Sequence, residues 1–146
     1  MRNKPSRERI ELLRSLPIFF GLANAELARV DRLITIFDLN AGRALTTEGT
    51  TARQAFIIVS GCAEVTIAGR RVATVGPGEV VGEMALLDGQ PRTATVTALE
   101  AMRVMVFDPR SFISLLSEPG IARKILDAEV QRLRVAELSH TAVVPA

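Results

Sequence analysis

Short runs of strand-forming residues, separated by regularly spaced glycines, fill the middle of this 146-residue chain, from about Ile36 to Phe107. The glycines that separate them are Gly42, Gly49, Gly61, Gly69, Gly76, Gly78 and Gly82. Because glycine adopts the positive φ values that tight turns need, this spacing predicts many short strands joined by turns. Residues 65–67 and 71–75 predict a β-hairpin. The whole pattern is typical of a sandwich or jelly roll.

Helical periodicity flanks this strand-rich region on both sides. Residues 6–16 predict one helix, ended by Pro17, and Asn24 is the expected N-cap of a second. After the strands, Asp108 caps a helix to about Leu116, since Pro109 suits the first helical position. A last helix is expected from residues 119–120 to about residue 139.

The chain is therefore predicted to be mainly β with flanking helices, in a single domain over residues 1–146. Its parts are N-terminal helices (about 6–35), a β-roll (about 36–107), C-terminal helices (about 109–139) and a tail (140–146). A chain of this length, 48% apolar, can bury a core of its own. The net charge of +2 and the lack of Trp and Tyr argue against a nucleic-acid-binding surface.

One segment carries chemistry: residues 82–96 have the sequence GEMALLDGQPRTATV. It places an acid, a helical turn and an arginine within eleven residues. Free N–H groups at a helix start can hold phosphate oxygens, and a guanidinium adds a planar fork of donors. A carboxylate repels phosphate but accepts from a sugar hydroxyl, so Glu83 and Arg92 must address different ends of a ligand. The segment predicts a site for a sugar phosphate.

The same segment resembles the phosphate-binding cassette of cyclic nucleotide-binding domains. This family includes bacterial catabolite activators, protein kinase A regulatory subunits and cyclic-nucleotide-gated channels. The shared pattern is Gly-Glu, small or apolar residues, a spacer, Pro-Arg, a small residue, Ala, Ser or Thr, and Val. Residues 16–19 and 56–61 also resemble the family, and the likeness covers roughly residues 12–136. It implies a bacterial-type single-domain member with an eight-stranded jelly-roll β-roll, N-terminal helices, a short phosphate-binding helix and a long C-terminal helix.

The resemblance also implies roles for individual residues. Arg92 and the backbone N–H of Ala85 are expected to bind oxygens of the cyclic phosphate, and Glu83 to accept a hydrogen bond from the ribose 2′-hydroxyl. Gly82 either lets the backbone approach the ribose or supplies a positive φ. Thr93 either binds the phosphate or simply opens a strand.

The purine is expected in an apolar slot of the roll, for which Val80 is a further candidate. The predicted ligand-binding residues are Val72, Val81, Gly82, Glu83, Met84, Ala85, Arg92, Thr93 and Thr95. In the family, a residue of the last helix closes over the base. Leu126, Val130 and Leu133 lie at helical spacing there and fit a core, a dimer seam or a lid.

The function implied by the resemblance is a cyclic nucleotide sensor that signals through movement of the C-terminal helix. cAMP is the expected ligand and cGMP the alternative. A threonine directly after the cassette arginine, where this chain has Thr93, often goes with cGMP binding in eukaryotic relatives, whereas many bacterial relatives with a threonine there prefer cAMP. No cofactor is expected. The alternative function is the sensor part of a catabolite-activator-type transcription regulator. That class carries a helix-turn-helix domain, for which too few residues follow the last helix, so this chain is not expected to bind nucleic acid directly.

An enzyme is not expected. His140 is the only histidine and Cys62 the only cysteine, so neither a metal centre nor a triad can be assembled around them. Expected partners are an unidentified effector protein and a second copy of the chain. The last helix has two apolar stripes, one of Ile121, Ile125 and Ala128 and the other of Leu126, Val130 and Leu133. Two stripes are more than one packing contact requires, which predicts a homodimer through this helix. No apolar run could span a membrane and no secretion signal opens the chain, so a cytoplasmic protein is expected.

Overall fold

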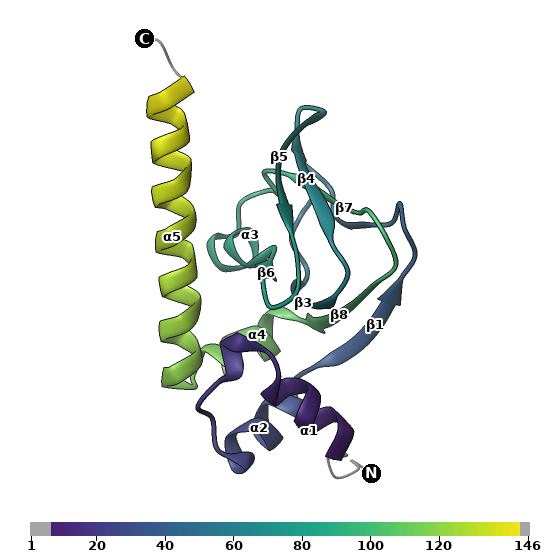
Figure 1. Ribbon diagram of the computed structural model, residues 1–146, viewed down its shortest axis with the longest axis vertical. Helices are drawn as coiled ribbons and strands as arrows, with labels where there is room; N and C mark the ends of the chain where they lie inside the picture. The colour runs from purple at the N-terminus through teal and green to yellow at the C-terminus, as the bar shows by residue number, and fades with distance from the viewer. Residues whose placement is uncertain (1–6, 144–146) are drawn as a thin grey trace.

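The computed structural model describes residues 7–143, without the side chains of residues 132–133 and 135–143. Three helical elements come first: α1 (Arg7–Arg14), the 3-10 helix η1 (Pro17–Phe19) and α2 (Asn24–Asp31). They lie together at one end of the molecule, below the strands in Figure 1. Residue 6, where the first helix is predicted to begin, lies outside the described residues.

The second helix begins at Asn24, whereas the sequence predicts that Asn24 caps it. Ala23 is the N-cap, and its N–H donates to the Glu26 carboxylate at 2.9 Å. The side chain of Asn24 instead accepts a hydrogen bond from Arg14 of α1. A contact between helices therefore takes the place of the predicted local cap.

Eight strands form two four-stranded antiparallel sheets, which confirms the predicted eight-stranded jelly roll. The strands are β1 (Thr35–Leu39), β2 (Ala44–Thr46), β3 (Ala55–Ser60), β4 (Ala63–Ile67), β5 (Arg70–Val75), β6 (Val80–Val81), β7 (Thr95–Ala98) and β8 (Met102–Phe107). One sheet has the order β1-β8-β3-β6 and the other the order β2-β7-β4-β5. The sandwich is consequently open on two sides, one between the edge strands β1 and β2 and one between β5 and β6.

The sheet that contains β8 separates two hydrophobic clusters. On β8, Val104 and Val106 face the interior of the sandwich, whereas Met105 and Phe107 pack with the helices on the outer face. Successive side chains of a strand point to opposite faces, so a strand buried on both sides needs an unbroken apolar run. Residues 55–59 of β3 and 104–107 of β8 meet this requirement.

Three helices follow or interrupt the strands. The short α3 (Glu83–Asp88) lies between β6 and β7, as predicted, and α4 (Pro109–Leu116) follows β8. The N–H of Ser111 donates to the Asp108 carboxylate at 2.7 Å, which confirms the predicted cap and lowers the pKa of Asp108.

The long α5 (Pro119–Val143) stands beside the roll in Figure 1 and ends four residues beyond the predicted residue 139. Ile121 and Ile125 are buried in the outer cluster, whereas Leu126 and Val130 are exposed. Leu133 falls among the side chains outside the described part. No helix in the described part of the chain is both long and apolar enough to cross a membrane.

Candidate functional site

A pocket of about 170 Å³ occupies the open side of the sandwich between β5 and β6. The cassette supplies one wall and the strands supply the other. Its lining residues are Thr46, Val65, Val75, Val80, Val81, Gly82, Glu83, Met84, Ala85, Arg92, Thr93, Ala94 and Val96. Seven of the nine predicted ligand-binding residues are thus brought together at one place.

Arg92 is the charged centre of this pocket, and only 7% of its surface is exposed. Its two terminal nitrogens donate to the backbone carbonyls of Gly82 and Gln54, each at 2.6 Å. Burial lowers the pKa of the Arg92 guanidinium, and the nearby negative charge of Glu83 opposes this shift. The guanidinium stays protonated at neutral pH, because the reference pKa of arginine is so high. It is a buried cation whose hydrogen bonds go to neutral oxygens, which favours an anionic ligand.

Gly82 adopts a left-handed conformation, with φ of 81°, immediately before α3. The positive φ was one of its two predicted roles. The structure adds another constraint, because a Cβ atom at this position would lie 2.5 Å from Nη1 of Arg92. The close neighbour of the glycine is therefore the arginine of its own cassette.

Glu83, Met84 and Ala85 form the first turn of α3. Glu83 is 3% exposed, although a carboxylate is rarely buried, while Met84 is 58% exposed. The first N–H groups of a helix have no partner within it, and the helix dipole makes this end positive. The N–H of Ala85 belongs to this group and lies on the same pocket as Arg92.

Val72 and Thr95, which are also predicted to bind the ligand, do not line this pocket. The β4–β5 ladder pairs Val65 with Ala73 and Thr66 with Arg71, so Val72 is the extra residue of a bulge and is 56% exposed. The hydroxyl of Thr95 accepts a hydrogen bond from the Glu48 N–H at 2.9 Å.

Several lining residues were missing from the sequence prediction, including Thr46, Val65, Val75 and Val96. Val65 and Val75 supply apolar side chains to the lining, whereas Val72 does not. Thr46 arrives from β2, and its hydroxyl donates to the Ala94 carbonyl at 3.1 Å. The apolar alternation of residues 63–67 indicates an inward Val65, but nothing local in the sequence brings β2 to this side.

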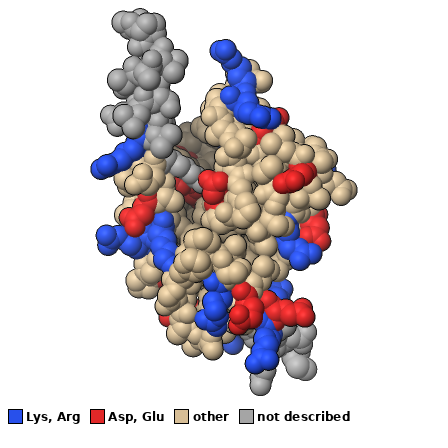
Figure 2. Space-filling view, in the orientation of Figure 1, with Lys and Arg blue, Asp and Glu red and all other residues tan. Residues whose placement is uncertain are grey.

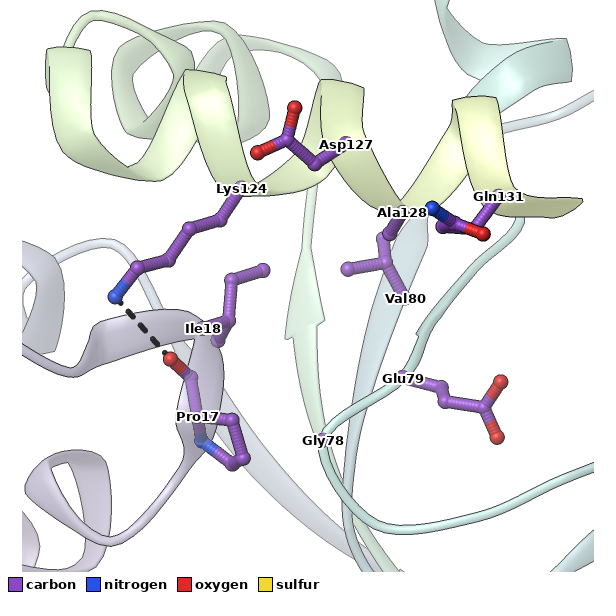
Figure 3. Close-up of a pocket in the computed structure, with 9 residues that line it drawn as sticks. All are labelled: Pro17, Ile18, Gly78, Glu79, Val80, Lys124, Asp127, Ala128 and Gln131. Carbon is purple, nitrogen blue, oxygen red and sulfur yellow. Dashed lines mark hydrogen bonds between the residues drawn. The ribbon is translucent and has the colours of Figure 1, made fainter.

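A second cavity, of about 570 Å³, lies between α5 and the roll (Figure 3). Pro17, Ile18 and the turn at residues 78–80 form one wall, and Lys124, Asp127, Ala128 and Gln131 of α5 form the other. The Lys124 ammonium donates to the carbonyls of Pro17, at 3.2 Å, and Phe20. The start of α5 is thus attached to η1, while the cavity separates its next turns from β6. Val80 lines both this cavity and the cassette pocket.

Charged side chains of the described residues form neither a broad patch of one sign on the face shown in Figure 2 nor a metal-binding group. Acidic and basic residues are intermixed on the face seen in Figure 2, without a broad area of one sign. Among the described residues, no three His, Cys, Asp or Glu side chains are grouped so that they could hold a metal ion.

Comparison with known proteins identifies relatives of this arrangement. The chain is 35% identical over 115 residues to the cAMP-dependent protein kinase regulatory subunit of Mycosarcoma maydis. The matched segment covers 73% of this chain and 22% of the relative. Its fold is similar to the Thermus thermophilus catabolite activator protein, with a TM-score of 0.75 and 26% identity over 87% of this chain and 62% of that one. It is also similar to a cAMP-binding acyltransferase from Mycobacterium smegmatis, with a TM-score of 0.75 and 28% identity over 88% of this chain and 41% of that one.

The chain spans less than two thirds of each of these relatives. By name they are a kinase regulatory subunit, a catabolite activator protein and an acyltransferase, and the chain corresponds to only part of each. The model of the cyclic nucleotide-binding domain family matches residues 36–118, which include every strand from β2 to β8, the cassette and α4. The chain belongs to the cyclic nucleotide-binding domain family.

Proposed function

We propose that the pocket between β5 and β6 binds a 3′,5′-cyclic nucleotide, with cAMP preferred to cGMP, and that the domain acts as a non-catalytic sensor. The observation that carries this proposal is the buried Arg92, held by two carbonyl oxygens beside the first turn of α3. The names of the relatives support the choice of cAMP, since one is a cAMP-dependent kinase regulatory subunit and another a cAMP-binding acyltransferase.

In this proposal the cyclic phosphate lies against Arg92 and the N–H of Ala85, and Thr93 adds a hydroxyl at the pocket mouth. Glu83 accepts a hydrogen bond from the ribose 2′-hydroxyl. Its carboxylate lies at the opposite end of the ligand from the phosphate, which avoids repulsion between the two anions. The base extends over the apolar wall formed by Val65 and Val75.

Signalling requires that the nucleotide bind one conformation more tightly than another. We propose that α5 is the moving element and that it approaches the roll when the pocket is filled. The cavity of about 570 Å³ beside β6 leaves room for this approach. The exposed Leu126 and Val130 form a separate apolar face on α5, which supports a homodimer through α5, or contact with an effector protein.

Isothermal titration with cAMP, cGMP, 2′-deoxy-cAMP and 5′-AMP tests the binding proposal. We expect cAMP to bind most tightly. A hydrogen bond to a charged group is worth about 1.5–3 kcal/mol, so 2′-deoxy-cAMP should bind about ten- to a hundredfold more weakly. Glu83→Gln should reduce this difference between the two ligands. The proposal fails if none of the cyclic nucleotides releases heat at millimolar concentration.

The alternative, a sensor part of a transcription regulator, draws its support from the similarity to the catabolite activator protein. A gel shift with generic duplex DNA at low salt tests whether this chain itself binds DNA, because nonspecific binding is strongest there. We expect no retardation by this chain, with or without cAMP. Retardation would show that the chain binds DNA directly, contrary to the expectation for a sensor domain.

A further inference from the structure

The second open side of the sandwich, between β1 and β2, also contains a pocket. Its volume is about 200 Å³, and it lies across the inner hydrophobic cluster from the cassette. It is lined by Phe37, Leu39, Arg43, Ala44, Leu45, Gln54, Phe56, Val104 and Val106. None of these residues lines the cassette pocket.

Seven of the nine residues that line this pocket have apolar side chains. Leu45, Phe56, Val104 and Val106 are buried members of the inner cluster, so they form a fixed floor. Phe37 is 51% exposed, which is unusual for a large aromatic side chain at the edge of a sheet that is otherwise well packed. An apolar group that entered the pocket would cover this exposed ring surface and gain from the burial.

The polar groups at this pocket are Arg43 and Gln54. Within the described part of the chain, the Arg43 guanidinium forms no ion pair and no side-chain hydrogen bond. Other arginines of the roll differ, since Arg71 pairs with Glu64 and Arg103 pairs with Asp38. The pocket therefore combines an apolar floor with an unpaired positive charge at its edge.

We propose that this pocket binds a small carboxylate with an apolar tail. The tail lies against Leu45, Phe56 and Phe37, and the carboxylate accepts hydrogen bonds from Arg43. A guanidinium matches a carboxylate in both charge and planar geometry, and no carboxylate side chain lines the pocket to favour a cation. The volume of about 200 Å³ suits a short aliphatic or monocyclic ligand rather than a peptide.

Three probes with the same tail and different heads test this proposal: hexanoate, hexylammonium and hexanol. Binding is followed by methyl and aromatic NMR shifts of Leu45, Val104 and Phe37 in the whole chain. We expect hexanoate to shift these signals and to bind at least about tenfold more tightly than hexylammonium, because a charge-assisted hydrogen bond contributes this much. Equal affinity for the three probes would overturn the proposal. So would hexanoate shifts confined to Arg92 and α3.

Two variants and one matched control test whether Arg43 and the pocket are responsible for the preference for hexanoate. Arg43→Gln should remove the preference for hexanoate over hexylammonium, and Ala44→Trp should weaken binding of all three probes by filling the pocket. Arg70→Gln is the control, because Arg70 is also an exposed arginine of the roll without a side-chain partner among the described residues, but it lies outside the pocket. It should leave the preference unchanged. A loss of preference in Arg70→Gln, or its retention in Arg43→Gln, contradicts the assignment.

Gln54 connects this pocket to the cassette. It lines the pocket, and its backbone carbonyl accepts the 2.6 Å hydrogen bond from Arg92. We therefore expect saturating hexanoate to change the cAMP dissociation constant about fivefold, with cAMP changing hexanoate affinity by the same factor. This coupling between the two ligands rests on the proposed function, because it requires that cAMP bind, whereas the binding of hexanoate alone does not. If hexanoate binds and the cAMP constant is unchanged, the connection through Gln54 is wrong.

Discussion

Arg92 combines a permanent charge with almost complete burial, and this combination makes its substitution informative. The Arg92 guanidinium is close enough to Glu83 for the negative carboxylate to raise its pKa, and both residues are almost fully buried. Removing one partner of a buried charged pair costs about 3–5 kcal/mol. The proposed phosphate contact and the two carbonyl contacts depend on the same side chain.

We expect Arg92→Ala to weaken cAMP binding by about two to three decades, as measured by titration calorimetry. Arg103→Ala is a suitable control, because Arg103 is an exposed arginine of β8 that pairs with Asp38. Circular dichroism should show that both variants are folded. An unchanged dissociation constant for a folded Arg92→Ala would show that the phosphate is bound elsewhere.

Gly82 and Gly89 bracket α3 and provide a matched pair. Both have a positive φ, of 81° and 72°. A Cβ atom at Gly82 would collide with Arg92, whereas one at Gly89 would meet no atom within 4 Å. The left-handed conformation costs a residue with a Cβ about 1–2 kcal/mol, and this cost applies to both positions.

We therefore expect Gly82→Ala to reduce the free energy of unfolding more than Gly89→Ala, by about 1 kcal/mol or more, because Arg92 must also move. Only Gly82→Ala should weaken cAMP binding. Urea unfolding and titration calorimetry measure the two effects. Equal losses in both variants would show that backbone strain alone explains the glycine at position 82.

Among the elements, the junction of α4 and α5 is tied to α2 by one ion pair. Arg29 donates to both carboxylate oxygens of Glu118, at 2.8 and 3.2 Å. The hydrogen bond from Arg29 lowers the pKa of Glu118. A carboxyl whose pKa is lower in the folded state stabilises the fold above its unfolded pKa, and this contribution is lost as pH falls through the folded pKa.

We expect Arg29→Met to lower the melting temperature at neutral pH and to make the remaining stability less sensitive to acid. Arg123→Met is the control, because the Arg123–Asp127 pair is 3.5 Å apart with both side chains largely exposed. Thermal melts between pH 3 and 7 compare the two. If both variants lose stability in parallel across this range, the Arg29–Glu118 pair has no special role at the junction.

The helices and strands also show how much of the structure can be predicted from the sequence alone. The apolar runs of β3 and β8 and the Asp108-Pro109 start of α4 follow from local chemistry, and the structure confirms them. The cassette segment was sufficient to predict α3, whereas the close approach of Gly82 to Arg92 emerged only from the structure. Val72 was misplaced because a bulge between paired strands depends on register, which a single strand does not reveal. Thr46 was missed because it reaches the pocket only through the pairing of β2 with β7.

For the whole molecule, the cavity between α5 and the roll provides the test of helix movement. Ala128 lines this cavity but is itself exposed, so a larger side chain can enter the space without disturbing the core. We expect Ala128→Trp to hold α5 away from the roll and to weaken cAMP binding, since apparent affinity falls with the population of the closed form.

Leu126→Trp is the matched control, because Leu126 is 59% exposed on the same helix and does not line the cavity. Hydrogen exchange over residues 119–138 should decrease when cAMP is added to the wild type and to Leu126→Trp, but not to Ala128→Trp. Identical exchange with and without cAMP in the wild type would mean that α5 does not respond to the ligand.

The strand β6 consists of only Val80 and Val81, and these neighbours belong to different clusters. Val81 packs inside the sandwich beside the cassette, whereas Val80 packs in the outer cluster with Ile121 and Ile125 of α5. The side chain beside the cassette pocket and the side chain beside α5 are therefore joined by a single peptide unit. In the proposed sensor, a displacement at the pocket would reach the helix through this unit, without a long chain of intervening side chains.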